Sequence, residues 1–187
     1  MLFILVLVSL LAVVSCAEFQ RNEFKKGYIT YPKVEEREVI GNYTLPQLQA
    51  APPCGTVMSS FNGIDAYSNG DNQGTGDSCA DWSSTGLQFQ CVEYTQRYFN
   101  ALHGLAPVWP ISFAYEMCSS YPDGITPVGG AQSGYGVVFN WPPYGHTAVV
   151  TNVRDGIIDV IEQNGSPSGT NSYYMSEVLC FLAPARR

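Results

Sequence analysis

Two apolar stretches separated by a short polar turn constrain the fold more than any other feature of the chain. Residues 146–153 (HTAVVTNV) and 157–164 (IIDVIEQN) flank the sequence Arg154-Asp155-Gly156. Runs of β-branched residues on either side of such a turn predict an antiparallel hairpin. Because side chains alternate between the two faces of a strand, the length of the turn decides which residues share a face.

Two turn lengths fit this hairpin. A two-residue turn puts His146 and Glu162 on opposite faces. A three-residue turn that ends in a left-handed Gly156 with a G1 bulge instead pairs His146 with Asn164 and Ala148 with Glu162. His146, Glu162 and Asn164 then share one face, where each polar side chain has a hydrogen-bonding neighbour if it is buried. We therefore predict the three-residue turn.

The remaining periodicities complete an α+β pattern. Apolar residues recur at helical spacing over 90–104, and a shorter helix is predicted at 111–121. Further strands are predicted at 136–140 and 173–182, with one short strand near 64–67 in an otherwise loop-rich region. Helices that precede an antiparallel sheet are typical of the α+β class.

The 187 residues divide into three segments by composition. Residues 1–17 are apolar, carry no charge and end in small residues, which predicts a signal peptide. Residues 18–53 are rich in charged side chains and end in two prolines, as expected of a charged N-terminal arm or pro-segment. Residues 54–187 form the predicted folded domain. Asn42 begins a glycosylation sequon in the arm.

Charge and motif content exclude several functional classes. The chain has 9 basic and 16 acidic side chains and a net charge of −7. An acidic chain without a basic stripe is a poor ligand for nucleic acid or an anionic membrane. No stretch after the first 17 residues is long and apolar enough to span a bilayer, and no metal-ligand cluster or cofactor motif is present. We predict a monomer that needs no cofactor.

The number of cysteines is informative for a secreted chain. Removal of the signal peptide leaves five, and an odd number predicts either a free thiol or a bond between chains. We predict that Cys91 is the free thiol and that the other four form two disulfides, whose pairing the sequence leaves open: Cys54, Cys79, Cys118 and Cys180.

Cys91 lies where a helix is predicted to begin, and the positive end of the helix dipole favours a thiolate there. A cysteine nucleophile also needs a base within hydrogen-bonding reach. His103 is twelve residues further along the same helix, about 18 Å away, which is too far. His146 is therefore the predicted base, and Glu162 or Asn164 is predicted to orient its imidazole.

Further residues are candidates for binding the substrate. The backbone N–H of Cys91 together with Gln90 or Gln88 is predicted to bind the oxyanion of the reaction, although a glutamine before a helix also serves as a cap. Asn164 begins a second sequon, which we expect to be unused because its side chain is turned into the cleft. Four residues are candidates for lining that cleft: Tyr67, Arg97, Trp141 and Tyr144.

Three ordered motifs resemble those of the CHAP domain (cysteine, histidine-dependent amidohydrolase/peptidase), which belongs to the wider papain-like and NlpC/P60 group. They are QCVEY (90–94), GHTAVV (145–150) and IEQN (161–164). AYSNG (66–70) and AYEM (114–117) are similar to motifs of the amidase domains of glutathionylspermidine-type enzymes.

The resemblance covers roughly residues 54–182. It implies a papain-like α+β fold in which Cys91 is the nucleophile, His146 the base, Glu162 the orienting residue and Asn164 a further polar partner.

The chain also departs from these relatives. Many carry two adjacent arginines after the QCVE start of the helix, whereas Gln96 precedes a single Arg97 here. Many have Gly-Asp at the strand before the histidine, where this chain has Tyr135-Gly136. The missing arginine weakens the case for recognition of a glutathione-type carboxylate.

The leading hypothesis is a secreted cysteine amidase or endopeptidase that cleaves peptide bonds in bacterial peptidoglycan. One alternative is an amidase that acts on glutathionylspermidine-like conjugates, and another is a non-catalytic secreted binding module on the same scaffold. The predicted signal peptide and disulfides favour an extracellular location or the lumen of a phagosome or lysosome.

Overall fold

The computed structural model of the chain describes residues 50–70 and 76–185. The predicted signal peptide, the predicted arm up to residue 49 and the sequon at Asn42 lie outside these residues. All described residues belong to one compact unit. In this described part, no helix is both long enough and apolar enough to cross a membrane.

The described residues form ten strands, one α-helix and two short 3-10 helices. In chain order, these are β1 (Val57–Phe61), β2 (Ile64–Tyr67), β3 (Trp82–Ser83), β4 (Gly86–Leu87), α2 (Cys91–His103), η1 (Ala114–Cys118), β5 (Ile125–Val128), β6 (Gly136–Phe139), β7 (His146–Arg154), β8 (Ile157–Ile161), β9 (Thr170–Tyr174), η2 (Met175–Glu177) and β10 (Val178–Pro184).

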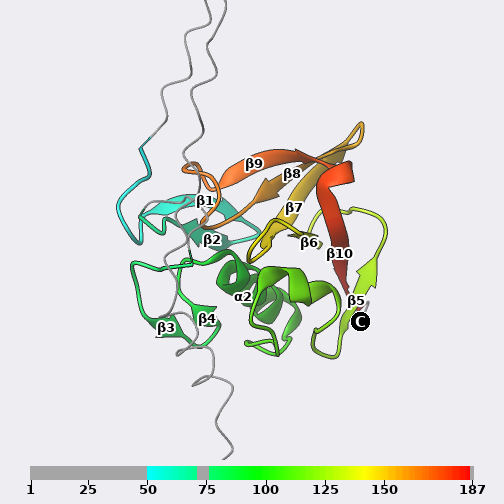
Figure 1. Cartoon of the computed structure of the whole chain (residues 1–187), viewed down its shortest axis with the longest axis horizontal. Coiled ribbons are helices and arrows are strands. Elements are labelled where there is room, and N and C mark those ends of the chain that lie inside the picture. The colour runs from blue at the N-terminus through cyan, green and yellow to red at the C-terminus, as the bar shows by residue number, and fades with distance from the viewer. Residues whose placement is uncertain (1–49, 71–75, 186–187) are drawn as a thin grey trace, which may run out of the picture. The chain divides into compact units, whose positions relative to one another are not determined.

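A six-stranded antiparallel sheet is the centre of the fold, with strand order β5-β10-β6-β7-β8-β9 (Figure 1). Two small hairpins, β1–β2 and β3–β4, precede α2 in the chain. Helix α2 packs on one face of the sheet, mainly against β7. The chain is therefore a mixed α+β structure that consists mostly of sheet.

The sheet is curled, because β9 and β10 are joined by only three residues although three strands separate them in the sheet. Four intervals between neighbouring strands would place them about 19 Å apart in a flat sheet. The four residue steps from Tyr174 to Val178 reach about 14 Å at full extension, and less in a 3-10 turn. Curling encloses the second face of the sheet, where a separate hydrophobic cluster includes Val137, Phe139 and Val160.

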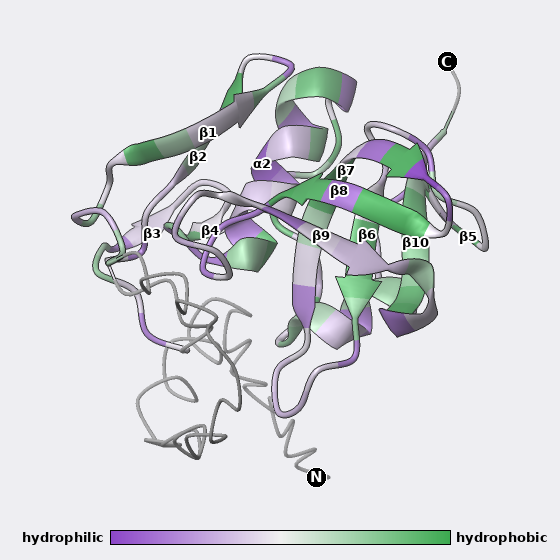
Figure 2. Cartoon of the chain, turned by 90° about the horizontal axis from the view of Figure 1, so that it is seen from above, coloured by the Kyte–Doolittle hydropathy of each residue, from purple (hydrophilic) through white to green (hydrophobic). Residues whose placement is uncertain are grey.

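The core on the α2 side is built from aromatic residues of the helix and aliphatic residues of the strands. Tyr94, Tyr98 and Phe99 are each at most 1% exposed and pack in one cluster with Val149 and Leu182. Both faces of β6 are thus covered, which explains why its sequence, GVVF, is continuously buried rather than alternating. Figure 2 shows long hydrophobic stretches along β8 and β10, whereas β9 is mostly polar.

Helix α2 matches its prediction to within one residue at each end. Phe89 has a positive φ of 66° and Gln90 is extended, so the helical conformation begins at Cys91. Gly104 ends the helix in the left-handed conformation, at φ 64°, and donates its N–H to the carbonyl of Asn100.

The predicted three-residue turn between β7 and β8 is wrong, but the predicted register beside His146 is correct. Arg154 pairs with Ile157, so the turn consists of Asp155 and Gly156 alone, both with positive φ. A β-bulge at Thr151 then shifts the pairing by one residue.

Beyond the bulge, Val150 pairs with Val160 and Val149 with Ile161. Continuing this register places Ala148 opposite Glu162, as the three-residue turn would have done. The extra residue that the register needs is therefore in the strand and not in the turn.

Two other predicted elements need correction. The helix predicted at 111–121 is the five-residue 3-10 helix η1, so the predicted layer of helices is a single α-helix in the described residues. The strand predicted at 173–182 is interrupted by η2, where the Glu177 side chain accepts a hydrogen bond from the Tyr174 N–H. One continuous strand cannot pair both with β8 and with β6. The papain-like arrangement of the fold stays a prediction.

Two disulfides connect distant parts of the domain, and Cys91 is the one unbridged cysteine among the described residues. Cys54–Cys79 joins the segment before β1 to the segment before β3, and Cys118–Cys180 joins η1 to β10. The prediction that Cys91 is the unpaired thiol is confirmed.

Removing the longer-range disulfide should lower the stability of the domain. The bond Cys118–Cys180 closes a loop across 62 positions, so its loss frees the unfolded chain most. We expect the double substitution Cys118→Ala/Cys180→Ala to lower the free energy of unfolding by about 2–5 kcal/mol, measured by urea denaturation. An unchanged unfolding midpoint would contradict this.

Candidate active site

Cys91 faces the sheet from the first turn of α2. Thr95 lies one turn further along the same side of the helix, and its hydroxyl is 3.2 Å from the hydroxyl of Thr147 in β7. Because residues four apart share a helix face, the Cys91 side chain also points toward β7, where His146 precedes Thr147. The cysteine is 9% exposed.

His146 and Glu162 form a buried ion pair at the ends of neighbouring strands. The Nε2 of His146 lies 2.8 Å from Oε2 of Glu162, and the two residues are 5% and 0% exposed. His146 is the first residue of β7, and Glu162 directly follows β8. The predicted partnership of these two residues is thus present in the structure.

The electrostatic surroundings of His146 favour its protonated form. Burial by itself lowers the pKa of an imidazole, because it disfavours the charged state. Hydrogen bonds with Cys91 and Glu162, together with their negative charges, outweigh burial and raise the pKa of His146 to about 10. At neutral pH, Nε2–H therefore donates to Glu162, and Nδ1 is the ring nitrogen left for Cys91.

Tyr173 of β9 holds the second side of the Glu162 carboxylate, a contact that the sequence did not predict. Its phenol lies 3.2 and 3.1 Å from the two carboxylate oxygens. Burial and the neighbouring Glu162 charge raise the pKa of Tyr173, so its hydroxyl remains a donor. No sequence signal identified this contact, because 173–182 was expected to be one strand and β9 was not predicted as the partner of β8.

Trp141 covers the imidazole of His146. The two rings are nearly parallel, at 5° with centroids 5.4 Å apart, and Phe139 stacks on Trp141. Trp141 is 36% exposed, so it also presents an aromatic surface to solvent beside the histidine. Tyr144 lies in the same β6–β7 loop but packs against Phe113 in a tilted arrangement, with centroids 5.6 Å apart.

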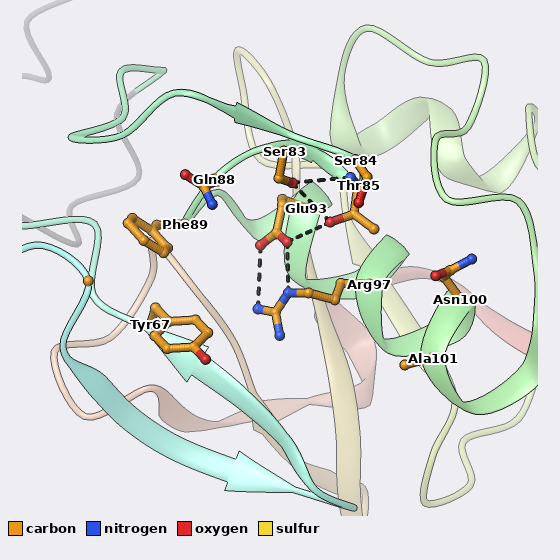
Figure 3. Close-up of a pocket in the computed structure, with 11 residues that line it drawn as sticks. Tyr67, Ser83, Ser84, Thr85, Gln88, Phe89, Glu93, Arg97, Asn100 and Ala101 are labelled. Atoms are coloured by element: carbon orange, nitrogen blue, oxygen red, sulfur yellow. Dashed lines mark hydrogen bonds and ion pairs between the residues drawn. The ribbon is translucent and has the colours of Figure 1, made fainter.

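Tyr67 and Arg97, the other two candidates for lining the cleft, lie on a different side of α2. They line a pocket of about 540 Å³ that Gln88 and Glu93 also line (Figure 3). The Arg97 guanidinium lies 5.3 Å from the Tyr67 ring centroid and forms an ion pair with Glu93. Glu93 and Arg97 occupy the helix face opposite Cys91, so the four candidates do not form one surface.

Gln90 and Asn164 are brought together beside Cys91. Asn164 Nδ2 donates to Gln90 Oε1 across 2.7 Å, and Gln90 Nε2 donates to the carbonyl of Asp77 across 2.6 Å. The Gln90 side chain makes no cap hydrogen bond to α2. Asn164 is 2% exposed, which is consistent with the expectation that its sequon is unused.

The thiol of Cys91, the imidazole of His146 and the buried carboxylate of Glu162 follow one another in the order that cysteine-dependent hydrolysis requires. Such a series can ionise a thiol and return a proton to a leaving group. Among residues 50–70 and 76–185, the structure contains no cluster of three or more His, Cys, Asp or Glu side chains placed to hold a metal ion.

Comparison with known families agrees with this arrangement. The model of the CHAP domain matches residues 69–164, about half of the chain, and the match includes Cys91, His146 and Glu162. The chain belongs to the CHAP domain family. No protein of a curated set matches the sequence.

Two solved structures match part of this CHAP-domain chain. A crystal structure of Ly7917 is 21% identical, with a TM-score of 0.45, and the match covers 52% of this chain and 54% of that chain. A second structure, of Ly7917 with the hydrolysing product of MDP, is 22% identical, with a TM-score of 0.43 and the same coverage. The matched region thus spans about half the length of those proteins.

Replacing Glu162 should change how the stability of the CHAP domain depends on pH. The folded domain retains a proton on His146 up to a pH of about 10, whereas the unfolded chain loses it near 6.5. The stabilisation is therefore complete below pH 6.5 and is lost as the pH rises toward 10, at no more than about 1.4 kcal/mol per pH unit. Glu162→Gln removes one cause of the raised pKa.

We therefore expect the free energy of unfolding to fall less steeply between pH 6 and 9 in Glu162→Gln than in the wild type. Urea denaturation at several pH values measures the two slopes. The comparison concerns slopes, so a general loss of stability in the variant does not affect it. Parallel curves would show that Glu162 does not raise the pKa of His146.

Gly165 leaves room for the Glu162 carboxylate, and a side chain there should displace it. A Cβ at position 165 would lie 2.7 Å from Glu162 Oε1 and 2.8 Å from its Cδ. We expect Gly165→Ala to cost about 1–3 kcal/mol in unfolding free energy and to make the pH slope resemble that of Glu162→Gln. Gly129→Ala is the matched control, because its Cβ would meet nothing within 4 Å. Equal behaviour of the two alanine variants would refute the steric argument.

Proposed function

We propose that this protein is a secreted cysteine amidohydrolase that cleaves amide bonds in the peptides of bacterial peptidoglycan. The observation that carries the proposal is the series of buried groups from Cys91 through His146 to Glu162. Membership of the CHAP family supports the reaction class. The substrate class rests on the resemblance to that family.

In the first half of the reaction, the Cys91 thiolate attacks the carbonyl carbon of the scissile amide. A tetrahedral intermediate forms with a new C–S bond, and the carbonyl oxygen becomes an oxyanion. The proton held on Nδ1 of His146 passes to the leaving nitrogen as the C–N bond breaks. The amine departs, and a thioester with Cys91 remains.

In the second half, neutral His146 takes a proton from a water molecule, which attacks the thioester. Collapse of the second tetrahedral intermediate breaks the C–S bond and releases the carboxylic acid. Glu162 stabilises the imidazolium at each stage where His146 carries two protons, and its bond to Nε2 fixes the orientation of the ring.

The first turn of α2 is the proposed oxyanion site. Backbone N–H groups at a helix N-terminus lack partners within the helix. The N–H of Cys91 is such a group, and it belongs to the same residue as the proposed nucleophilic thiol. Gln90 is the proposed second donor, since Asn164 and Asp77 hold its amide in place. Gln88 lines the pocket on the other side of α2 and is the weaker candidate.

Cleavage of glutathionylspermidine-like conjugates is the second candidate activity. At the position where many such relatives have the first of two arginines, Gln96 is 2% exposed and donates to the Thr85 carbonyl. It therefore offers no charge to a glutathione-type carboxylate, which favours the peptidoglycan substrate. A non-catalytic binding module on the same scaffold is the third candidate.

Two disulfides among the described residues support a location outside the reducing cytosol. Together with the predicted signal peptide at residues 1–17, they make secretion, or delivery to a phagosomal or lysosomal lumen, the proposed destination. A monomer without a cofactor is the proposed active form.

Substituting the nucleophile should separate an enzyme from a binding module. We expect Cys91→Ala to lower the rate of peptide release from purified peptidoglycan by at least about 10⁴-fold with little change in unfolding free energy. His146→Ala should lose a comparable factor, whereas His103→Ala, at the far end of α2, is the matched control. Release of new amino groups measures the activity.

The same assay with a glutathionylspermidine conjugate in place of peptidoglycan distinguishes the two substrate classes. Labelling with a thiol reagent is a separate test of the nucleophile. One fast-reacting thiol in the wild type that is absent from Cys91→Ala supports an enzyme. Undiminished activity in Cys91→Ala would refute the assigned nucleophile.

A further inference from the structure

The segment that carries Glu162 is not held by strand pairing alone. Pairing of β8 ends at Ile161, and the backbone of Glu162 makes one further bond, from its N–H to the Gly169 carbonyl. Asn164 then turns into the left-handed conformation, at φ 52°. Side-chain contacts must therefore set the position of residues 162–164 relative to α2.

Gln163 makes four hydrogen bonds to groups far from it in the sequence. Its Nε2 donates to the carbonyl of Gln90 across 3.1 Å and to Oε2 of Glu93 across 3.0 Å. Its Oε1 accepts from the Tyr67 backbone N–H and from Arg97 Nη2, both across 2.9 Å. The residue is 0% exposed.

These four bonds use the whole capacity of a side-chain amide, which has two N–H donors and one oxygen that accepts twice. A carboxylate of the same shape keeps the acceptors but loses both donors, and an apolar side chain loses all four bonds. Two of the partners of Gln163 are backbone groups. The other two, Glu93 and Arg97, are already paired with each other, as Figure 3 shows.

The bond to Gln90 connects the two halves of the active site. The Gln90 carbonyl directly precedes Cys91 in the chain and also accepts the N–H of Tyr94 in the first turn of α2. At the other end, Gln163 directly follows Glu162, which holds His146. One buried amide therefore joins the turn that carries the nucleophile to the residue that orients the base.

We propose that Gln163 is a positioning residue that sets the separation between Cys91 and the His146–Glu162 pair. It acts through backbone and side-chain contacts on the helix face opposite Cys91 and does not touch the reacting atoms. The proposal rests on the proposed function for its effect on turnover. Its effect on the Cys91 thiol is independent of any substrate.

The first test is Gln163→Glu. The new carboxylate would lie about 3 Å from that of Glu93, both buried, and could not donate to the Gln90 carbonyl. We expect kcat on peptidoglycan peptides to fall by about 100-fold, since a misplacement of about 1 Å has a cost of that size, while KM changes little. The melting temperature should fall as well.

The second test is the exchange Glu93→Gln/Gln163→Glu, which separates positioning from general stability. An amide at position 93 can donate to a carboxylate at position 163, and Arg97 again faces one carboxylate. The bond to the Gln90 carbonyl stays lost. We expect the melting temperature to return close to that of the wild type while kcat remains at least about tenfold lower. Glu93→Gln alone is the matched control and should retain most of kcat.

Alkylation of Cys91 by iodoacetamide between pH 5 and 9 provides a readout without substrate. A greater separation between the thiol and the His146 imidazole should slow alkylation, and we expect the reactivity at the low end of this pH range to fall in both variants with the Gln163 substitution. If it falls while no variant and no wild-type sample hydrolyses peptidoglycan, the proposed function fails and the positioning role stands.

The proposal is overturned if the exchange variant recovers wild-type kcat together with its stability. It is also overturned if the alkylation profiles of the wild type and both Gln163 variants coincide. Should Gln163→Glu fail to fold, the exchange variant, whose buried charge is balanced, decides the outcome.

Discussion

The buried contact between His146 and Glu162 is the interaction on which the rest of the site depends. A carboxylate that is 0% exposed must be paired, and here an imidazole and the Tyr173 phenol both bond to it. Because the partners come from β7, β9 and the end of β8, the pair forms only when the sheet is complete. Its negative charge in turn keeps His146 protonated beside Cys91, so the architecture of the sheet and the chemistry of the thiol are coupled.

Cys91, the proposed nucleophile, follows a residue that is held by loops joined through the Cys54–Cys79 disulfide. Cys79, bonded to Cys54, donates its backbone N–H to Asn69 Oδ1, and Asn69 Nδ2 in turn donates to the Asp77 carbonyl. That carbonyl accepts a hydrogen bond from Gln90, the residue before Cys91. The Cys54–Cys79 disulfide thus contributes to the geometry of the candidate active site.

Sequence patterns predicted much of this site, because its parts are local. Helical periodicity with a closing glycine located α2, and cysteine parity predicted the free thiol that the start of the helix assigns to Cys91. Strand alternation predicted the partnership of His146 with Glu162. The patterns did not distinguish an additional residue in the turn from an additional residue in the strand, because either one gives the same pairing beside His146. The register was right for a wrong reason, since the additional residue is the bulge at Thr151 and not a third turn residue.

What the sequence by itself determined is the chemistry available: one unbridged thiol at the start of a helix, one histidine at the start of a strand, and a carboxylate within reach across a hairpin. What only the tertiary structure decided is how these groups are held. The contacts of Tyr173 and Gln163 join residues 11 to 96 positions apart, and no periodicity records such contacts. They arise because a curled sheet and a helix bury polar groups that must then find partners in one another.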